Sequence, residues 1–183
     1  MKSNPETITV PLSKVKMLIS LLLAMGFVTL GVWLAFFNQE VLANTNPFLL
    51  QVLGWITILF FGIASVIILR KLMLPTNGLE INSDGITDNS SGISAGFIPW
   101  NIIVDVEEIS VMNQKFISIQ LNNPEEFIAS QQNNFTKKAM TVNHQKFGSA
   151  VSISANNLKI KHQQLLNLLQ SNLKKYKQFT QNN

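Results

Sequence analysis

Two long apolar runs constrain this chain more than any other feature of its sequence. The first, MLISLLLAMGFVTLGVWLAFF, covers Met17 to Phe37, and the second, FLLQVLGWITILFFGIASVIIL, covers Phe48 to Leu69. Neither contains an acidic or basic residue. A helix of about 20 apolar residues spans the roughly 30 Å hydrocarbon core of a bilayer. The rest of this 183-residue chain is too short to wrap two such helices in a soluble core, so both runs predict transmembrane helices.

Basic residues flank the two runs, and none lies between them. They are Lys2, Lys14, Lys16, Arg70 and Lys71. Cytoplasmic flanks of membrane helices are enriched in Lys and Arg, so both termini are expected in the cytoplasm. A cleaved signal peptide is a poor alternative, because the first run is longer than its apolar region. The predicted order is a cytoplasmic segment 1–16, a transmembrane helix 17–37, an external loop 38–47 and a second transmembrane helix 48–69.

Small side chains recur along one stripe of each run. They are Ser20, Ala24, Gly31 and Ala35 in the first run, and Gly54, Gly62 and Ser65 in the second. Small residues let two helices approach closely in lipid, so these stripes indicate a possible contact between the helices. The absence of ionisable residues within the runs argues against a proton relay or an ion path.

The second half of the chain has the pattern of a small soluble domain, expected at 79–183 after a linker at 70–78. The segment GLEINSDGITDNSSG alternates apolar and polar residues around Asp84-Gly85, which is a hairpin signal. Residues 116–121 and 150–155 fit further strands. The tail 158–179 carries leucines at helical spacing, namely Leu166, Leu169 and Leu173. Residues 131–148 fit either a helix or a loop.

A proline and a tryptophan interrupt the apolar stretch GFIPWNIIVDVEEISV. Pro99 cannot be a central ladder partner, so it marks an edge, a bulge or a corner. We expect Trp100, directly after it, to anchor the core. The apolar positions then follow two phases, first Ile102, Val104 and Val106, and later Ile109 and Val111. Because a one-residue slip turns side chains to the other face, this change of phase predicts a bulge at Glu107-Glu108.

The chain resembles a family of small bacterial membrane proteins in which two spans precede a pleckstrin-homology-like (PH-like) domain. The resemblance rests on GLEINSDGIT, GFIPWNIIVDVEEI, and SISANNL followed by a leucine-rich helix. It implies a membrane helical hairpin plus an α+β domain, built as a bent antiparallel barrel or sandwich capped by a C-terminal helix. It also implies a location in the bacterial cytoplasmic membrane. The resemblance supplies no catalytic residues.

Residues that could carry chemistry are few. The chain has no cysteine and two histidines, His144 and His162, both in polar segments. Asn82, Asp84 and Asp88 do not have the spacing of a calcium loop, and they fit turn positions better. The acids at 105, 107 and 108 fit a solvated strand face better than a metal patch. We therefore expect neither an enzyme nor a cofactor, metal, nucleic acid or small-molecule substrate.

Charges are segregated along the second half of the chain. Eight acids and one lysine lie between Glu80 and Glu126, and eight lysines and no acid lie between Lys137 and Lys177. Two hypotheses follow. The first is a membrane-tethered scaffold that binds a protein partner or copies of itself. The alternative is electrostatic contact with anionic lipid head groups. The lipid-contacting candidates are Arg70, Lys71, Lys174, Lys175 and Lys177.

Overall fold

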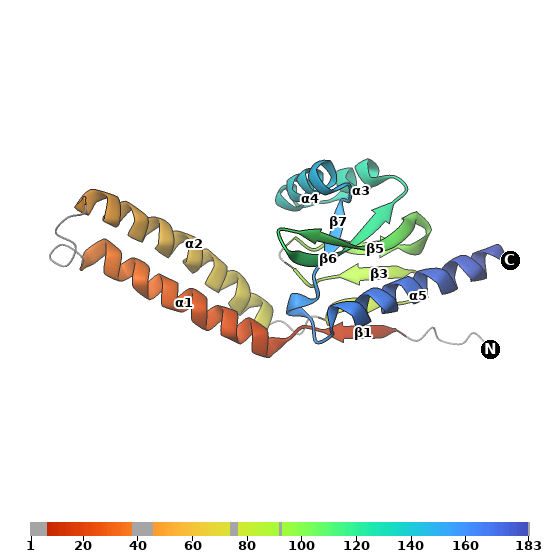
Figure 1. Cartoon of the computed structure of the whole chain (residues 1–183), viewed down its shortest axis with the longest axis horizontal. Coiled ribbons are helices and arrows are strands. Elements are labelled where there is room, and N and C mark those ends of the chain that lie inside the picture. Colours follow the sequence, from red (N-terminus) through yellow and green to blue (C-terminus); the bar gives the residue numbers. More distant parts are fainter. Residues whose placement is uncertain (1–6, 38–45, 74–76, 92, 183) are drawn as a thin grey trace. The chain divides into compact units, whose positions relative to one another are not determined.

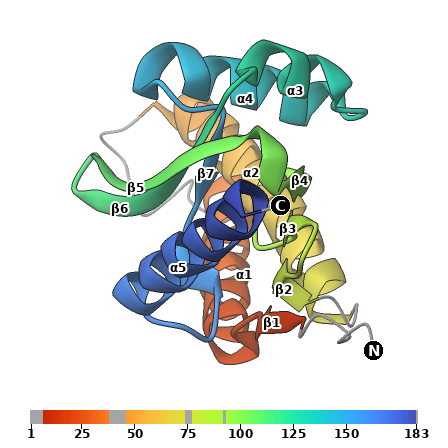
Figure 2. The ribbon, with the colours of Figure 1, turned by 90° about the vertical axis from the view of Figure 1, so that its right-hand side faces the viewer.

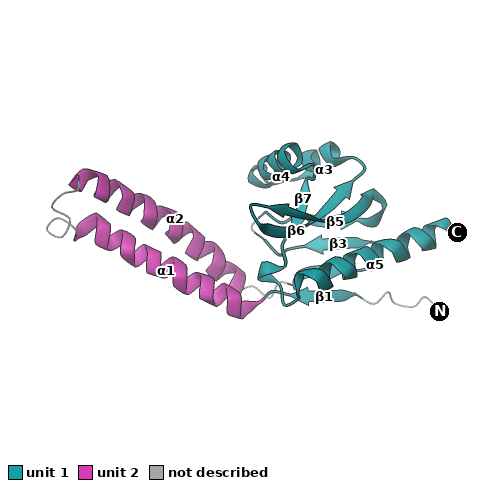
Figure 3. Ribbon diagram, in the orientation of Figure 1, with its two compact units in different colours: residues 1–12, 76–183 teal, residues 13–75 magenta. Residues whose placement is uncertain are grey.

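A computed structural model describes residues 7–37, 46–73, 77–91 and 93–182. These residues form two compact units, one helical and one mixed (Figures 1 and 3). The helical unit covers Ser13–Pro75, and the mixed unit combines Met1–Leu12 with Thr76–Asn183. Most of the loop predicted at 38–47 lies outside the described residues.

The helical unit consists of α1 (Lys14–Phe36) and α2 (Pro47–Met73). Both helices are long and apolar enough to cross a membrane. Only 17% of the most apolar stretch of α1 and 6% of that of α2 are buried, which is unlike the core helix of a soluble protein. Asn46 caps α2, since its side-chain oxygen accepts a hydrogen bond from the Phe48 amide at 3.0 Å.

Small residues form the contact between α1 and α2. The buried residues of α1 are Met17, Ala24, Gly31 and Ala35, and that of α2 is Gly54. A Cβ atom added to Gly54 would lie 2.7 Å from the Ala35 nitrogen and 2.8 Å from the Gly31 oxygen. The predicted contact stripe is thus confirmed at Ala24, Gly31, Ala35 and Gly54. Ser20 is exposed instead, and a Cβ at Gly62 would meet no atom within 4 Å.

The mixed unit contains two antiparallel sheets. The first has the order β1 (Ile8–Pro11), β2 (Asn77–Ile81), β3 (Gly85–Asp88) and β4 (Gly96–Pro99). The second has the order β5 (Ile103–Val111), β6 (Gln114–Leu121) and β7 (Val151–Ile153). The α+β class is confirmed, but the sheets do not close into a barrel. Pro99 ends β4, and a 3₁₀ turn at Trp100–Ile102 leads into β5 without pairing the two strands.

Strand β1 lies in the N-terminal segment and was not predicted. It pairs with β2, with Val10 opposite Leu79 and Pro11 opposite Asn77. Leu12 forms a bridge with Leu158. Val10 and Leu12 are buried, so the segment before the helices contributes to the core of the domain. The helical hairpin is therefore an insertion between two neighbouring strands of one sheet.

The predicted bulge in β5 is wrong in position. Pairing with β6 runs without a break through Glu107 and Glu108, and the register shifts instead between Ile103 and Asp105. Val104 is the extra residue and is 49% exposed, whereas Ile103 and Val106 are buried. After Val106 the apolar residues of β5 lie on the opposite face of the strand, because that face is covered there. Val111, on this face, lines a cavity beside helix α4.

Trp100 anchors the core, as predicted. It is 3% exposed, and its indole nitrogen donates to the Asn82 carbonyl at 2.8 Å. Its ring stacks on that of Tyr176 with centroids 6.3 Å apart. The corner after Pro99 is thus tied both to the β2–β3 turn and to the C-terminal helix.

Three helices complete the mixed unit: α3 (Pro124–Ser130), α4 (Asn134–Phe147) and α5 (His162–Gln181). Helix α4 falls in the segment that was predicted as either helix or loop. Asn133 caps its start by accepting from the amides of Phe135 and Thr136, and Gly148 ends it in a left-handed conformation. Within this unit, α3 and α4 lie on one side of the β5–β7 sheet, and β1 and α5 lie on the other (Figures 1 and 2).

Candidate functional site

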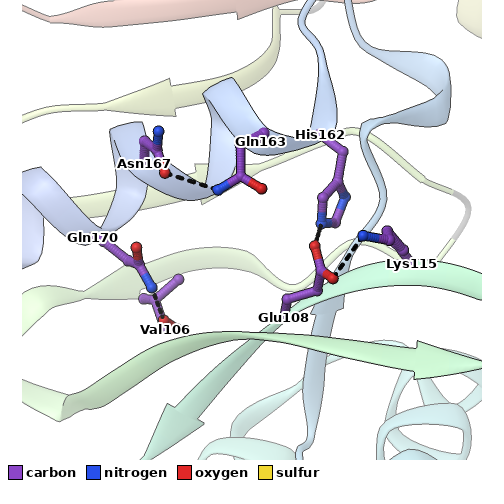
Figure 4. Close-up of polar contacts among 7 residues, drawn as sticks. All are labelled: Val106, Glu108, Lys115, His162, Gln163, Asn167 and Gln170. Atoms are coloured by element: carbon purple, nitrogen blue, oxygen red, sulfur yellow. Dashed lines mark hydrogen bonds and ion pairs between the residues drawn. The ribbon is translucent and has the colours of Figure 1, made fainter.

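Helix α5 runs along β5, the edge strand of the second sheet. Because β5 pairs with β6 alone among the described strands, its outer carbonyl groups need other donors. The Gln170 side chain donates to the Val106 carbonyl at 2.8 Å, and Lys177 donates to the Val104 carbonyl at 2.6 Å. Helix α5 thereby covers an edge that would otherwise be open to another strand (Figure 4).

An ionic cluster lies near the start of this α5–β5 contact (Figure 4). The Glu108 carboxylate is 2.9 Å from the Lys115 ammonium and 2.8 Å from His162 Nε2. The hydrogen bond from Lys115 lowers the pKa of Glu108, partial burial opposes this shift, and His162 adds to it. The cluster joins β5, β6 and α5, so its first effect is structural. A carboxylate can also orient a histidine for proton transfer, but nothing here presents a reacting partner.

Asn82 and Asp88 hold the chain in the turn and the loop that border β3. The Asn82 side-chain oxygen accepts from the amides of Asp84 and Gly85, at 2.9 and 3.0 Å. Asp88 is buried and accepts from the amide and hydroxyl of Ser90, at 2.8 and 2.6 Å. The predicted turn positions are confirmed for Asn82 and Asp84, whereas Asp88 is the last residue of β3 and holds the loop that follows it. In the described part of the chain, no group of three or more His, Cys, Asp or Glu residues could hold a metal ion.

The predicted lipid-contacting residues are divided between the two units. Arg70 and Lys71 lie in the last turn of α2, and Lys174, Lys175 and Lys177 lie on α5. Lys174 and Lys177 line a shallow cavity of about 410 Å³ together with Asp105. Lys175 is not part of its lining. One donor of Lys177 is already bound to the edge of β5.

Two other lysines lie where the domain connects to the helices. The Lys159 amide donates to the Pro11 carbonyl at 2.9 Å, and exposed Lys161 caps α5 two residues later. From Pro11 the chain reaches the first residue of α1 in three residues, a span of at most about 11 Å. Lys174 lies twelve residues along α5 from His162, which is about 18 Å of helix. No sequence signal singles out Lys159 and Lys161, because their position depends on the pairing of β1.

A cavity of about 230 Å³ lies beside α4 and β7. Its apolar lining includes Ile93, Val111, Phe116, Met140 and Phe147. Its polar lining consists of Asp88, Ser91, Asn143, Ser152 and Ser154. A cavity with this lining suits an apolar side chain better than a charged ligand.

No family model, curated protein or solved structure matches this chain, so the geometry of its own residues carries the functional argument.

Proposed function

We propose that this protein is a membrane-anchored scaffold whose α+β domain binds a protein partner. Helices α1 and α2 cross the membrane as a hairpin, and both termini and the domain lie in the cytoplasm. The basic residues that flank the helices support this orientation. The apolar outer faces of both helices support membrane insertion, since they expose large side chains along their length.

The pairing of β1 with β2 carries the proposal. The hairpin leaves the domain between these two strands, and only Ser13 separates Leu12 from α1. A domain with two short connections is restrained at the membrane surface, whereas a domain on one long linker samples a wide volume. Such restraint suits a module that presents its binding surface to partners at the membrane.

The domain is proposed to be PH-like, of the kind found in the bacterial cytoplasmic membrane. Two antiparallel sheets and a C-terminal helix support this assignment, as do the two helices that accompany the domain. Binding is favoured over catalysis because two carboxylates that could react, those of Asp88 and Glu108, are bound within the fold. Asp88 holds a loop, and Glu108 holds the α5–β5 contact.

The test is cross-linking of the full chain in its native membranes, followed by purification and identification of the proteins captured. Three forms are compared: the wild type, Trp100→Ala, which disrupts the domain core, and Phe97→Ala, a control on the surface of β4. A partner captured by the wild type and by Phe97→Ala, but lost with Trp100→Ala, supports the proposal. Identical capture by all three forms, or no capture, contradicts it.

Contact between the domain and anionic lipid is the second candidate. The position of Lys159 and Lys161 beside the connection to α1 favours it, because basic groups near an anionic surface each contribute about 1 kcal/mol. We expect slower acetylation of these two lysines in anionic than in neutral nanodiscs at low salt. Lys174 and Lys175, which the sequence predicts as lipid-contacting, are measured in the same way. Equal rates in both lipids for all four lysines would contradict the lipid hypothesis.

A further inference from the structure

We propose that the outer face of α4 is the docking surface, and that its occupant is an acidic, amphipathic segment of a partner protein. This inference rests on the proposed function and assigns the surface that performs it. The α4 face is defined as Phe135, Lys138, Ala139, Val142 and Lys146, together with Asn143 and Phe147 at its border with the cavity.

Apolar side chains of α4 point both into the fold and away from it. Thr136 and Met140 are buried against the domain. Phe135 and Val142 are 67% and 38% exposed, and they lie seven residues apart on one stripe of the helix. The stripe needs no apolar residue for folding, since the opposite side of the helix already packs on the domain. Phe135 and Val142 therefore supply the apolar part of the proposed docking surface.

The α4 face carries a shallow, open depression. Phe135, Lys138, Ala139, Val142 and Asn143 line a shallow cavity of about 240 Å³. Asn143 also lines the 230 Å³ cavity beside β7, whose wall includes Met140 and Phe147. The two cavities share Asn143 in their linings and provide neighbouring places for apolar anchors. Binding through a few anchors seated in pockets is the usual way in which an amphipathic segment is recognised.

Charge decides the chemistry of the occupant. Lys137, Lys138 and Lys146 lie on α4, and the chain has no acidic residue after Glu126. The ion pairs recorded among the described residues all involve Glu108, so none uses an α4 lysine. Glu125 and Glu126 on the neighbouring helix α3 are the nearest acids along the chain, and neither pairs with an α4 lysine. The unpaired cations attract an acidic segment and repel a basic one.

A bilayer is a poorer occupant than a protein segment, although lysines beside apolar residues also suit a membrane surface. Two residues, Leu12 and Ser13, connect β1 to α1, whereas α4 has no direct connection to either long helix. Within the domain, α4 lies on the other side of the β5–β7 sheet from β1 (Figures 1 and 2). The cavities along α4 accept separate apolar anchors, so a protein segment is the proposed occupant.

The experiment places a photoreactive phenylalanine analogue at Phe135 of the full chain in its native membranes. The same analogue at Phe97, an exposed position on β4, is the matched control. After illumination, mass spectrometry identifies the cross-linked peptide. We expect a segment of another protein, rich in Asp and Glu around apolar residues, joined at 135 and not at 97. Products with lipid, with a second copy of this chain or with a basic segment would overturn the inference, as would no product.

A synthetic peptide with the sequence of the captured segment then tests the energetics on the purified full chain. Phe135→Ala should weaken binding about tenfold, as expected for a buried aromatic anchor. Lys138→Gln with Lys146→Gln should weaken it about fivefold at low salt, the scale of two exposed ion pairs. Lys174→Gln with Lys175→Gln, the matched control on α5, should leave it unchanged. Unchanged binding in both α4 variants contradicts the assignment.

Failure of the inference and failure of the proposed function give different results. If a partner is captured through the folded domain but cross-links from Phe97 rather than Phe135, the scaffold function stands and the α4 face is wrong. If the domain captures no partner at all, both are wrong.

Discussion

The helical hairpin and the α+β domain bury opposite kinds of side chain. Where α1 meets α2, the buried residues are mostly small, and large apolar side chains such as Leu22, Leu59 and Phe60 point outward. In the domain, large apolar residues such as Leu79, Ile98 and Leu169 are fully buried. The difference is the one expected between helices that associate in lipid, which gives no hydrophobic drive for their contact, and a domain that folds in water.

The two regions consequently respond to different substitutions. The hairpin depends on close backbone approach, so added volume at its contact should harm it. The domain depends on buried volume and on hydrogen bonds at its sheet edge, so removal of atoms should harm it. Four substitutions test this contrast, each with a matched control.

The largest expected effect is in the domain core. Trp100→Ala should lower the free energy of unfolding by about 3–5 kcal/mol, because it removes a buried ring and the hydrogen bond to Asn82. The control Phe97→Ala, at a position 49% exposed, should cost about 1 kcal/mol or less. Pulse proteolysis in urea on the full chain in nanodiscs measures both. Equal losses for the two variants would show that burial does not control stability here.

The hairpin contact should be sensitive to added volume. Gly54→Leu should cost about 1–3 kcal/mol, since its side chain would overlap the backbone of α1. Gly62→Leu is the control, because no atom lies within 4 Å of its Cβ position. The chain has no cysteine, so the measurement can use Phe27→Cys with Phe61→Cys, at rings whose centroids are 4.4 Å apart. Cross-linking should slow with Gly54→Leu only, and an equal rate in both variants would argue against close packing.

The α5–β5 contact should show a smaller effect. Gln170→Ala should cost about 0.5–1.5 kcal/mol, because the Val106 carbonyl loses its donor. Gln163→Ala is the control, since its carboxamide bonds to Asn167 of the same helix at 3.0 Å. Hydrogen exchange of α5 amides reports the opening of the helix. Faster exchange is expected for Gln170→Ala, and indistinguishable protection in the two variants would contradict the role given to Gln170.

The smallest effect concerns the pH dependence of the domain. The pKa of Glu108 is lowered in the folded protein, mainly by the hydrogen bond from Lys115. Its carboxylate therefore adds stability above the unfolded-state pKa of about 4.3, and this contribution disappears as the pH falls through the lower folded-state value. Glu108→Gln should destabilise the domain at pH 7 and reduce the loss seen on acidification. Urea midpoints at several pH values measure this, and Gln163→Ala, which leaves every carboxylate in place, is the control.

Local patterns predicted several parts of the domain correctly. The β2–β3 turn, the corner at Pro99, the buried Trp100 and the leucines of α5 each follow from a few neighbouring residues. The position of the bulge in β5 does not follow from neighbouring residues. A change in the spacing of apolar residues arises either from a bulge or from burial of the opposite face of the strand. That ambiguity is resolved by Val111, which faces the cavity beside α4.

The candidate site was less accessible to prediction than the fold. The sequence groups Lys174, Lys175 and Lys177 close together, but it does not show that Lys177 bonds to the Val104 carbonyl, 73 positions away. Lys159 lies beside Pro11, which is even more distant in sequence. The α4 face was missed because its segment is polar overall, and only the packing of Met140 shows which side of the helix is left exposed.

The sequence by itself determined that the chain has two segments for an apolar environment and one domain of strands with a terminal helix. Composition and short periodicity suffice for that, because membrane length and side-chain alternation are local properties. Only the tertiary structure decided that β1, which precedes the hairpin in the sequence, pairs with β2, which follows it. The same holds for the position of α5 along the edge of β5. Those contacts join residues remote along the chain, and their stability comes from burial and hydrogen bonds that exist only once the two sheets have formed.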